Sequence, residues 1–225
     1  MFRIASYNVR HCADMQLRPH EYAKDVKAIG AVLCGFQEVD EYTSRCYLDT
    51  AKYFAEKTGF DCRFSKAIDH RGGEYGHCLL SYYKIVSHET LPLYSVGCEG
   101  RVVGKSVVLI DGEEVQFLNT HLDHTNKERR GIQFKELFAL VDQDKPYLIT
   151  GDFNTADFSE FSDFVAAGAS LANCDEHYLP SFIPTGKGID NIIVSKHFNI
   201  VNVGIYNEIH SDHKMIYADV TRRKA

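Results

Sequence analysis

Residues 146–154 read PYLITGDFN, a short apolar run that leads directly into an acid and an amide. Pro146 to Thr150 has the length and composition of a strand that is buried on both faces. The tetrapeptide Gly151-Asp152-Phe153-Asn154 then places two polar side chains just beyond that strand. The sequence therefore predicts a sheet that carries polar groups at one of its edges.

Similar apolar runs alternate along the chain with amphipathic stretches. Asp111-Gly112, between two of the runs, is a strong hairpin signal, and Gly59 fits the residue that follows a helix. Since each predicted helix lies between strands, we expect one α/β domain over residues 1–225, with mixed sheets covered by helices. Strands are predicted at 2–9, 32–36, 78–86, 102–110, 115–120, 146–150, 189–194, 198–206 and 214–220, and helices at 20–29, 50–57, 124–141 and 158–167.

Polar side chains cluster where these strands begin or end. If the strand ends meet at one rim of the sheets, where ligands commonly bind, the clusters come together. Carboxylate and amide oxygens suit Mg²⁺, Mn²⁺ or Ca²⁺, and imidazole supplies an acid or base near neutral pH. The clustered residues are Asn8, Glu38, His121, Asp152, Asn154, Asp190, Asp212 and His213.

The composition is that of a folded globular protein, with 44% hydrophobic and 25% charged residues. The formal net charge is −6, from 25 Lys and Arg against 31 Asp and Glu. This balance argues against a large electrostatic footprint for duplex nucleic acid and against a polybasic membrane anchor. Nucleic acid remains a possible partner, but without an extended basic groove.

The cysteines and the N-terminus indicate the compartment. The chain has 7 cysteines, an odd count, and no C-x-x-C spacing, so neither a disulfide framework nor a structural zinc site is expected. The opening residues, MFRIASYNVR, lack the basic and apolar regions of a signal peptide. No apolar run approaches the ~18 residues of a transmembrane segment. We therefore expect a cytoplasmic protein, and we expect a monomer.

Taken in order, the polar motifs resemble the endonuclease/exonuclease/phosphatase superfamily, in particular its small bacterial metal-dependent hydrolases. The resemblance runs from residue 4 to residue 220, and the ordered set is far more specific than any single motif. It implies a four-layer α/β sandwich, two mixed β-sheets flanked by helices, and an enzyme that uses Mg²⁺ or Mn²⁺. The matching segments are IASYNVR, GFQEVD, GGEYGHCLLS, NTHLDH, ITGDFN, GIDNIIVS and SDHKMIYADV.

The resemblance also implies a metal site and a water site. Glu38 would be the principal metal ligand with Asn8 near it, and Asp212 would contact a metal or its waters. A carboxylate suits this role because protein-bound Mg²⁺ usually has one or two carboxylate ligands. Asp152 would orient and help to deprotonate the attacking water, and Asn154 would hold a phosphoryl oxygen and help to fix that water.

The remaining implied roles concern the phosphate. His213 would stabilise the charge that develops there, and Asp190 would hold the His213 ring. His121 would be the second imidazole on the phosphate, and the Tyr75 hydroxyl would reach a phosphate oxygen. Glu74 aligns with an acid that orients the second histidine in some relatives, so we expect it to pair with His121.

Three further residues beside the motifs are candidates for substrate contacts: Arg45, Arg129 and His124. Guanidinium groups match phosphate bidentately. For these residues, as for Arg101 and Arg130, the alternative interpretation is an ordinary exposed side chain.

The substrate class stays open, because one fold hosts several chemistries. The favoured function is a Mg²⁺-dependent phosphoesterase that hydrolyses a phosphodiester or phosphomonoester by metal-assisted in-line attack of water. A structure-specific or single-strand nuclease of DNA or RNA would need a basic or aromatic track beside the site. A sphingomyelinase-like lipid phosphodiesterase would need an exposed apolar loop, for which 91–94 and 181–184 are the candidates. A non-catalytic binding module would be expected to lose the acids that are present here.

Overall fold

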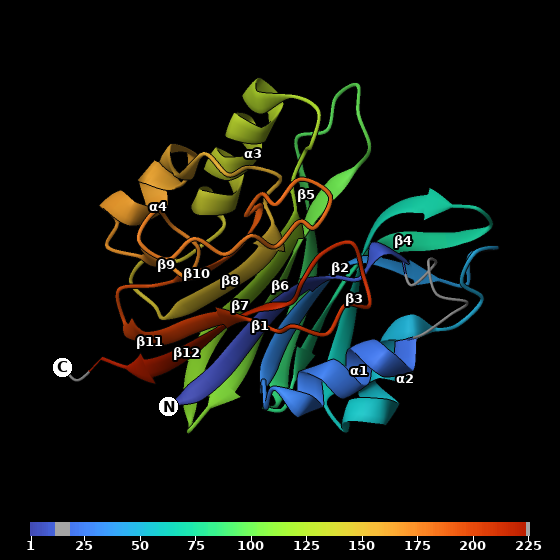
Figure 1. Ribbon diagram of the computed structural model, residues 1–225, viewed down its shortest axis with the longest axis horizontal. Helices are drawn as coiled ribbons and strands as arrows, with labels where there is room; N and C mark the ends of the chain where they lie inside the picture. Colours follow the sequence, from blue (N-terminus) through green and yellow to red (C-terminus); the bar gives the residue numbers. More distant parts are fainter. Residues whose placement is uncertain (12–18, 224–225) are drawn as a thin grey trace.

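The computed structural model describes residues 1–11 and 19–223. It contains two mixed six-stranded sheets, with strand orders β11-β12-β1-β2-β4-β3 and β5-β6-β7-β8-β10-β9 (Figure 1). The strands are β1 (Phe2–Asn8), β2 (Leu33–Glu41), β3 (Asp61–His70), β4 (Gly73–Ser81), β5 (Ile85–Leu93), β6 (Arg101–Ile110), β7 (Glu113–His121), β8 (Tyr147–Asp152), β9 (Ser170–Leu171), β10 (Asp190–Val194), β11 (Phe198–Ile205) and β12 (Ile216–Arg222).

Helices cover the outer face of each sheet, as Figure 1 shows. The first sheet packs against α1 (Pro19–Ala28) and α2 (Thr50–Thr58). The second packs against α3 (Lys127–Ala139), the 3-10 helix η2 (Phe158–Phe161) and α4 (Ser162–Ala166). The predicted four-layer α/β sandwich is confirmed.

Strand alternation builds these layers, because successive side chains of a strand point to opposite faces. In β1, Ile4 joins the apolar cluster between the sheets, whereas Tyr7 joins the cluster under α1 and α2. In β8, Leu148 lies between the sheets and Ile149 faces α3. Each sheet is therefore buried on both faces near its centre, which matches its nearly continuous apolar runs.

A polar contact joins the two sheets just beneath the rim. A Cβ atom at Gly35 of β2 would lie 2.0 Å from Thr150 Oγ1 of β8, so only glycine permits this approach. Asn119 of β7 crosses the same gap. Its amide nitrogen donates to two carbonyls of the facing sheet, and its Oδ1 accepts from Gln37 Nε2 at 2.7 Å. The central parallel pairs, β1 with β2 and β7 with β8, are thereby held in fixed relation.

Some predicted boundaries were wrong. The predicted strand at 78–86 is split, because β4 ends at Ser81 and β5 begins at Ile85 in the other sheet. Strands β3 and β5 were missed, since both are edge strands with many half-exposed polar residues and little alternation. The helix predicted to begin at residue 124 begins at Lys127, because Asn126 accepts a hydrogen bond from Arg129 N and caps it.

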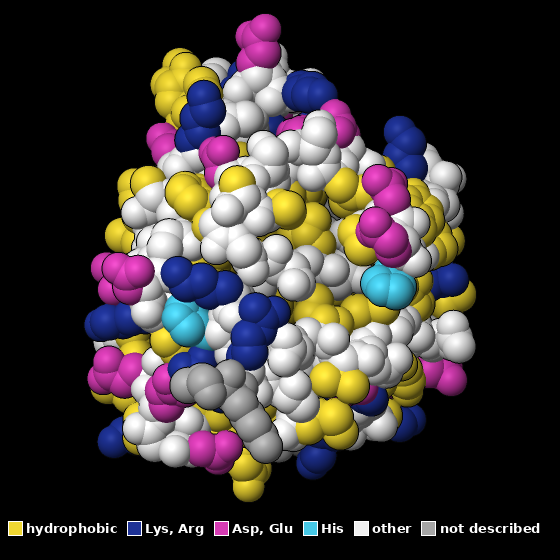
Figure 2. Space-filling model, turned by 90° about the vertical axis from the view of Figure 1, so that its left-hand side faces the viewer, with side chains coloured by type: hydrophobic (Ala, Val, Ile, Leu, Met, Phe, Trp, Pro, Cys, Tyr) yellow, Lys and Arg dark blue, Asp and Glu magenta, His cyan; other side chains and the backbone are white. Residues whose placement is uncertain are grey.

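The surface and the thiols bear on the other expectations. Within residues 1–11 and 19–223, we find no helix with the length and apolar character needed to cross a bilayer. Figure 2 shows Lys and Arg side chains interspersed with Asp and Glu on the face beside β11 and β12. Cys12 lies outside the described residues. The free cysteines among the described residues are Cys34, Cys46, Cys62, Cys78, Cys98 and Cys174.

Candidate active site

Backbone register brings the polar residues of the second sheet together at its rim. Pairing of β7 with β8 sets His121 opposite Asp152, and pairing of β8 with β10 sets Asp190 opposite the same residue. In the first sheet, Asn8 ends β1 and its amide nitrogen reaches Asp152 Oδ2 at 2.9 Å. The strand ends therefore meet as the sequence predicted.

Glu38 reaches this rim through an irregularity in β2. The register of β2 against β4 shifts between Phe36 and Val39, and Glu38 itself has a φ of 57°. Bulges re-aim side chains beside active sites, and a left-handed φ outside glycine is held in place only by its surroundings. The redirected Glu38 carboxylate accepts a hydrogen bond from Asn8 Nδ2 at 3.0 Å.

Asp152 is the hub of the site. Its Oδ1 accepts from Asn154 N at 2.9 Å, while its Oδ2 lies 3.6 Å from His121 Nε2 and 3.7 Å from His213 Nε2. The side chain is 2% exposed. Burial, together with the nearby Asp190 charge, raises the pKa of Asp152 to about 7. A carboxylate in this position can take up a proton near neutral pH.

The two imidazoles differ in charge. His213 Nδ1 lies 2.8 Å from Asp190 Oδ2, and both side chains are buried. Burial opposes protonation of His213, but the carboxylates of Asp190 and Asp152 outweigh it and raise its pKa to about 10. Burial, with the charge of Arg101, instead holds the pKa of His121 well below its usual value. At neutral pH the site thus presents one cationic and one neutral imidazole.

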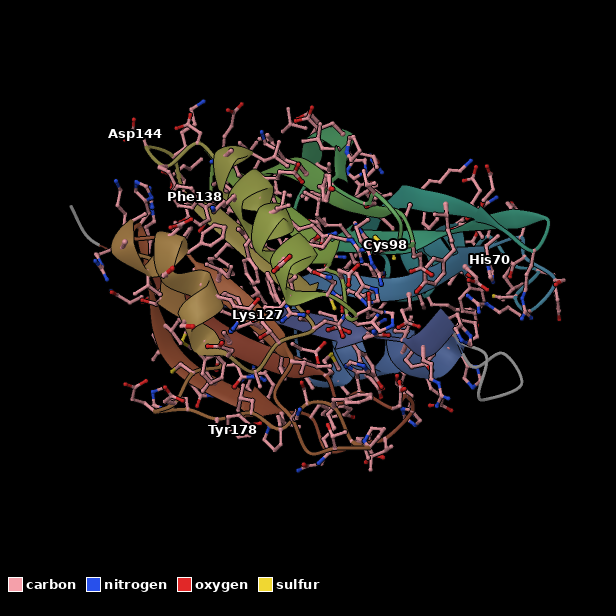
Figure 3. The ribbon with its side chains drawn as sticks, turned by 90° about the horizontal axis from the view of Figure 1, so that it is seen from above. His70, Cys98, Lys127, Phe138, Asp144 and Tyr178 are labelled. Atoms are coloured by element: carbon pink, nitrogen blue, oxygen red, sulfur yellow. The ribbon has the colours of Figure 1, made fainter. Side chains whose placement is uncertain are left out.

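Glu38, Asp152, His121 and His213 line a cavity of about 420 Å³, whereas Asn8 and Asp190 are not among its lining residues. A larger hollow of about 510 Å³ lies elsewhere, between α1 and α2, and its polar lining consists of histidine and lysines. Figure 3 helps to locate the smaller cavity, because Cys98 precedes the lining residues Glu99 and Arg101. Cys98 lies between α3, which begins at Lys127, and the β3–β4 hairpin at His70. The residues that line the smaller cavity are Glu38, Tyr75, Glu99, Arg101, His121, His124, Asp152, Asn154, Phe182, Ile189, Asp212 and His213.

The donor set in this cavity fits a hard divalent cation. Ligand atoms of Asp152, Asp190 and His213 lie within 4.8 Å of one another, but the last two are engaged with each other. The carboxylates of Glu38 and Asp212 also line the cavity. Burial raises the pKa of Glu38, and the Asp212 charge adds to this effect, whereas the hydrogen bond from Asn8 and the His213 charge oppose it. Carboxylate oxygens are ligands that Mg²⁺ prefers.

Asn8 is already engaged with its neighbours. Its Oδ1 accepts from Arg10 N at 2.9 Å, and its amide nitrogen donates to both Glu38 and Asp152. Its clearest role in the structure is to join those two carboxylates. Metal ligation by Asn8 stays a prediction.

Arg101 is the site residue that the sequence interpretation undervalued. We expected an exposed cation, but the side chain is 5% exposed and lines the cavity. Its Nη1 lies 2.9 Å from Glu99 Oε1, its Nη2 lies 3.5 Å from His124 Nδ1, and its Nε has no hydrogen-bond partner among the described residues. Arg101 stands at the start of β6 and belongs to none of the matching sequence motifs, so no sequence signal pointed to it.

Other predicted contacts lie elsewhere. Glu74 was expected to pair with His121, but it is half-exposed and forms an ion pair with Lys66 at 2.9 Å. The Arg45 guanidinium is bidentate on the buried Asp40 and lies over the Tyr75 ring, 5.4 Å from its centroid. Neither Glu74 nor Arg45 is among the residues that line the cavity.

The last two arginines beside the motifs are held by acids. Arg129 is bound to Asp123 at 2.7 Å and does not line the cavity. Arg130, which we expected to be exposed, is buried and bound to Glu160. These ion pairs neutralise the two positive charges that a substrate would otherwise meet.

Comparisons with known proteins agree with this architecture. A sequence profile described as the Endonuclease/Exonuclease/phosphatase family matches residues 5–213. No curated protein matched the sequence.

Solved structures with the same fold share little sequence with this chain. A Bacteroides vulgatus endonuclease/exonuclease/phosphatase is 18% identical over 99% of each chain, with a TM-score of 0.81. A Bacteroides thetaiotaomicron mannosyl-6-phosphatase is 22% identical over 98% of this chain and 100% of its own, with a TM-score of 0.75. The human nocturnin catalytic domain, solved with a sulfate anion, is 20% identical over 99% and 93%, with a TM-score of 0.79.

Proposed function

This chain belongs to the endonuclease/exonuclease/phosphatase family, and we propose that it is a divalent-metal-dependent phosphoesterase that hydrolyses a phosphate ester by in-line attack of water. Family members are phosphoester hydrolases. One observation carries the proposal: Asp152 Oδ2 lies 3.6 Å from His121 Nε2 and 3.7 Å from His213 Nε2, and Asn8 joins Asp152 to Glu38. That arrangement supports the assignment of a base, an electrophile and a cation-binding carboxylate to one cavity.

Asp152 is the proposed base. Asn154 N and Asn8 Nδ2 fix its two oxygens, so the carboxylate is presented in one orientation. Orientation of this kind supplies much of the rate enhancement when a water must attack in line. With its pKa at about 7, Asp152 accepts the proton of the attacking water as the new P–O bond forms and the bond to the leaving alkoxide breaks. The alkoxide then takes a proton from solvent water, and Asp152 returns its proton to solvent.

His213 is the proposed stabiliser of the charge on the phosphate. Asp190 accepts from its Nδ1, which leaves the Nε2–H free to donate toward the cavity. A buried donor that is already oriented costs no reorganisation during the reaction. His121 and Tyr75 line the same cavity and are proposed to contact the remaining phosphate oxygens.

Glu38 and Asp212 are the proposed holders of Mg²⁺ or Mn²⁺, with Asn8 beside them. When bound, such a cation neutralises the phosphate oxygens and makes a coordinated water more acidic. The chain's own contribution is to keep both carboxylates in the lining of the cavity, one through the β2 bulge and the other through the loop before β12.

Arg101 supports an anionic substrate with more than one exposed oxygen. Its guanidinium is buried in the cavity wall, and its Nε lacks a partner among the described residues. Arg101 is paired with Glu99 at 2.9 Å, but as a second cationic side chain in the lining that also contains His213 it suits a phosphate that is held on two sides. One structural neighbour is described as a mannosyl-6-phosphatase, and another was solved with a bound sulfate anion. Both descriptions are consistent with a tetrahedral anion in this cavity.

A substrate screen tests the proposal. Wild type and His213→Ala would be compared, with Mg²⁺ present, on phosphomonoesters of sugars, dinucleotides, RNA, single-stranded and abasic DNA, and phospholipids. We expect at least one class to be hydrolysed by wild type and not by the variant. No hydrolysis of any class, or equal hydrolysis by both proteins, would contradict the proposed function.

A further inference from the structure

Helix α1 carries an acid that the proposed chemistry does not use. Asp25 is 2% exposed and lies on the helix face whose Tyr22, Ala23 and Val26 pack into the core against the first sheet. A carboxylate in such surroundings is costly unless it is hydrogen-bonded. The partner of Asp25 is His210, whose Nδ1 lies 2.8 Å from Asp25 Oδ2.

The same helix also holds the backbone of residue 210. The Tyr22 hydroxyl donates to the His210 carbonyl at 2.6 Å, and the two rings pack edge to face with centroids 6.5 Å apart. Residue 210 is therefore anchored to α1 through both its side chain and its main chain. The neighbouring Ser211 hydroxyl extends this anchor to β1, because it donates to the Asn8 carbonyl at 2.7 Å.

These contacts hold one side of the segment that carries Asp212 and His213. Strand β11 ends at Ile205 and β12 begins at Ile216, so the segment lies outside those strands. Its other side pairs with residues 181–183, where Ile183 N donates to the Asp212 carbonyl and Lys214 N donates to the Ser181 carbonyl. The segment is closed at its base by Tyr206 N donating to the Met215 carbonyl at 2.8 Å. Within it, His213 N donates to Ser211 Oγ at 3.3 Å, which connects His213 directly to the anchored residues.

We propose that the Asp25–His210 pair is a positioning device that sets the place of the His213 imidazole in the cavity. The inference rests on the proposed function, in which His213 stabilises charge on the phosphate. Asp25 and His210 touch no reacting atom. They act through residues 211–213, so loss of the pair should move the imidazole, and Asp212 with it, and leave the rest of the cavity lining in place.

Asp25→Asn is the variant that tests this role, because it keeps the shape and removes the carboxylate. Its matched control is Asp219→Asn, which breaks another ion pair, Arg3 with Asp219 at 2.7 Å, toward the opposite end of β1. Displacement of a catalytic group by 1 Å can cost ~10²-fold in rate. We expect Asp25→Asn to lower kcat at least ~10-fold with KM within ~2-fold, and Asp219→Asn to keep kcat within ~2-fold.

A second readout separates positioning from general stability. The Nδ1 proton that His213 shares with Asp190 should give a downfield proton resonance in the NMR spectrum. We expect it to shift or broaden in Asp25→Asn and to stay in place in Asp219→Asn. This readout needs no turnover, so it still tests the pair if wild type proves to hydrolyse no phosphate ester, an outcome that would refute the proposed function alone.

The outcomes that overturn the inference are equally specific. A folded Asp25→Asn protein with wild-type kcat and an unmoved His213 resonance would refute it, as would equal losses in Asp25→Asn and Asp219→Asn. If Asp25→Asn does not fold, Tyr22→Phe removes only the hydroxyl that holds the His210 carbonyl. We then expect that variant to move the same resonance, and an unchanged resonance would refute the inference.

Discussion

Replacing Asp190 with asparagine removes one buried charge and preserves the shape of the side chain. Asp190 Oδ2 lies 2.8 Å from His213 Nδ1, and the His213 pKa of about 10 depends on this neighbour together with Asp152. At an effective dielectric constant of ~20, two unit charges ~4 Å apart attract by about 4 kcal/mol. Since ~1.36 kcal/mol corresponds to a factor of ten in rate, we expect kcat to fall by up to ~10³-fold.

The assay is steady-state hydrolysis of bis-p-nitrophenyl phosphate at saturating Mg²⁺, with a thermal melt of each protein. Asp219→Asn is the control, because it removes a carboxylate from an ion pair outside the cavity. We expect that control to keep kcat within a factor of about two. A fall of less than ~10-fold in folded Asp190→Asn would show that the Asp190 charge does not support His213 in the reaction.

Four further perturbations test separate parts of the structure. Mg²⁺ or Mn²⁺ at 100 times its Kd should stabilise wild type by ~2.7 kcal/mol and so raise its melting temperature. Glu38→Gln should abolish that rise. Arg101→Met should raise KM ~10-fold with a smaller effect on kcat, as measured by initial rates. Asn119→Ala leaves several buried polar groups without partners and should cost ~3 kcal/mol or more in urea unfolding, whereas the exposed Asn202→Ala should cost under ~1 kcal/mol. Burial raises the pKa of Glu41 from 4.5 to about 8. The stability that Glu41 contributes is therefore complete below pH 4.5 and is lost as pH rises through 8. Between pH 5 and pH 9, the free energy of unfolding of wild type should fall by at least ~1 kcal/mol relative to that of Glu41→Gln.

The layered fold could be predicted because its central strands are buried on both faces. The strand segments around Ile4 and around Leu148 are nearly continuous in apolar residues, and each segment ends in polar residues. Edge strands give no such signal. In β3 and β5, half-exposed polar side chains follow no strict alternation, so those strands were missed.

The core of the candidate site was predictable for a related reason. Asp152, Asp190 and His121 stand at strand ends, and register alone brings them opposite one another. Glu38 also follows an apolar run, but its direction depends on a bulge that nothing in the sequence marks. Its motif placed it correctly in the chain, and the backbone irregularity supplies its orientation.

Charged residues outside the strand ends were predicted less well. Arg45 and Arg129 lie beside motifs, yet each is held by a nearby acid, Asp40 or Asp123. Arg101 shows the reverse, since long-range packing of β6 against the rim buries it in the cavity wall. Arg45, Arg129 and Arg101 each pair with an acid within six residues in the sequence, so local sequence does not separate them. Which of them lies in the cavity lining depends on the tertiary fold.

The most direct test of the central claim is hydrolysis of bis-p-nitrophenyl phosphate by wild type, His213→Ala and Asp152→Asn, each with Mg²⁺ or Mn²⁺ and again in EDTA. We expect wild type to hydrolyse the ester only when the divalent cation is present. We expect each variant to lose at least ~10²-fold in rate, the usual cost of removing one electrostatic partner of the reaction. Full activity in either variant, or in EDTA, would contradict a metal-dependent phosphoesterase at this site.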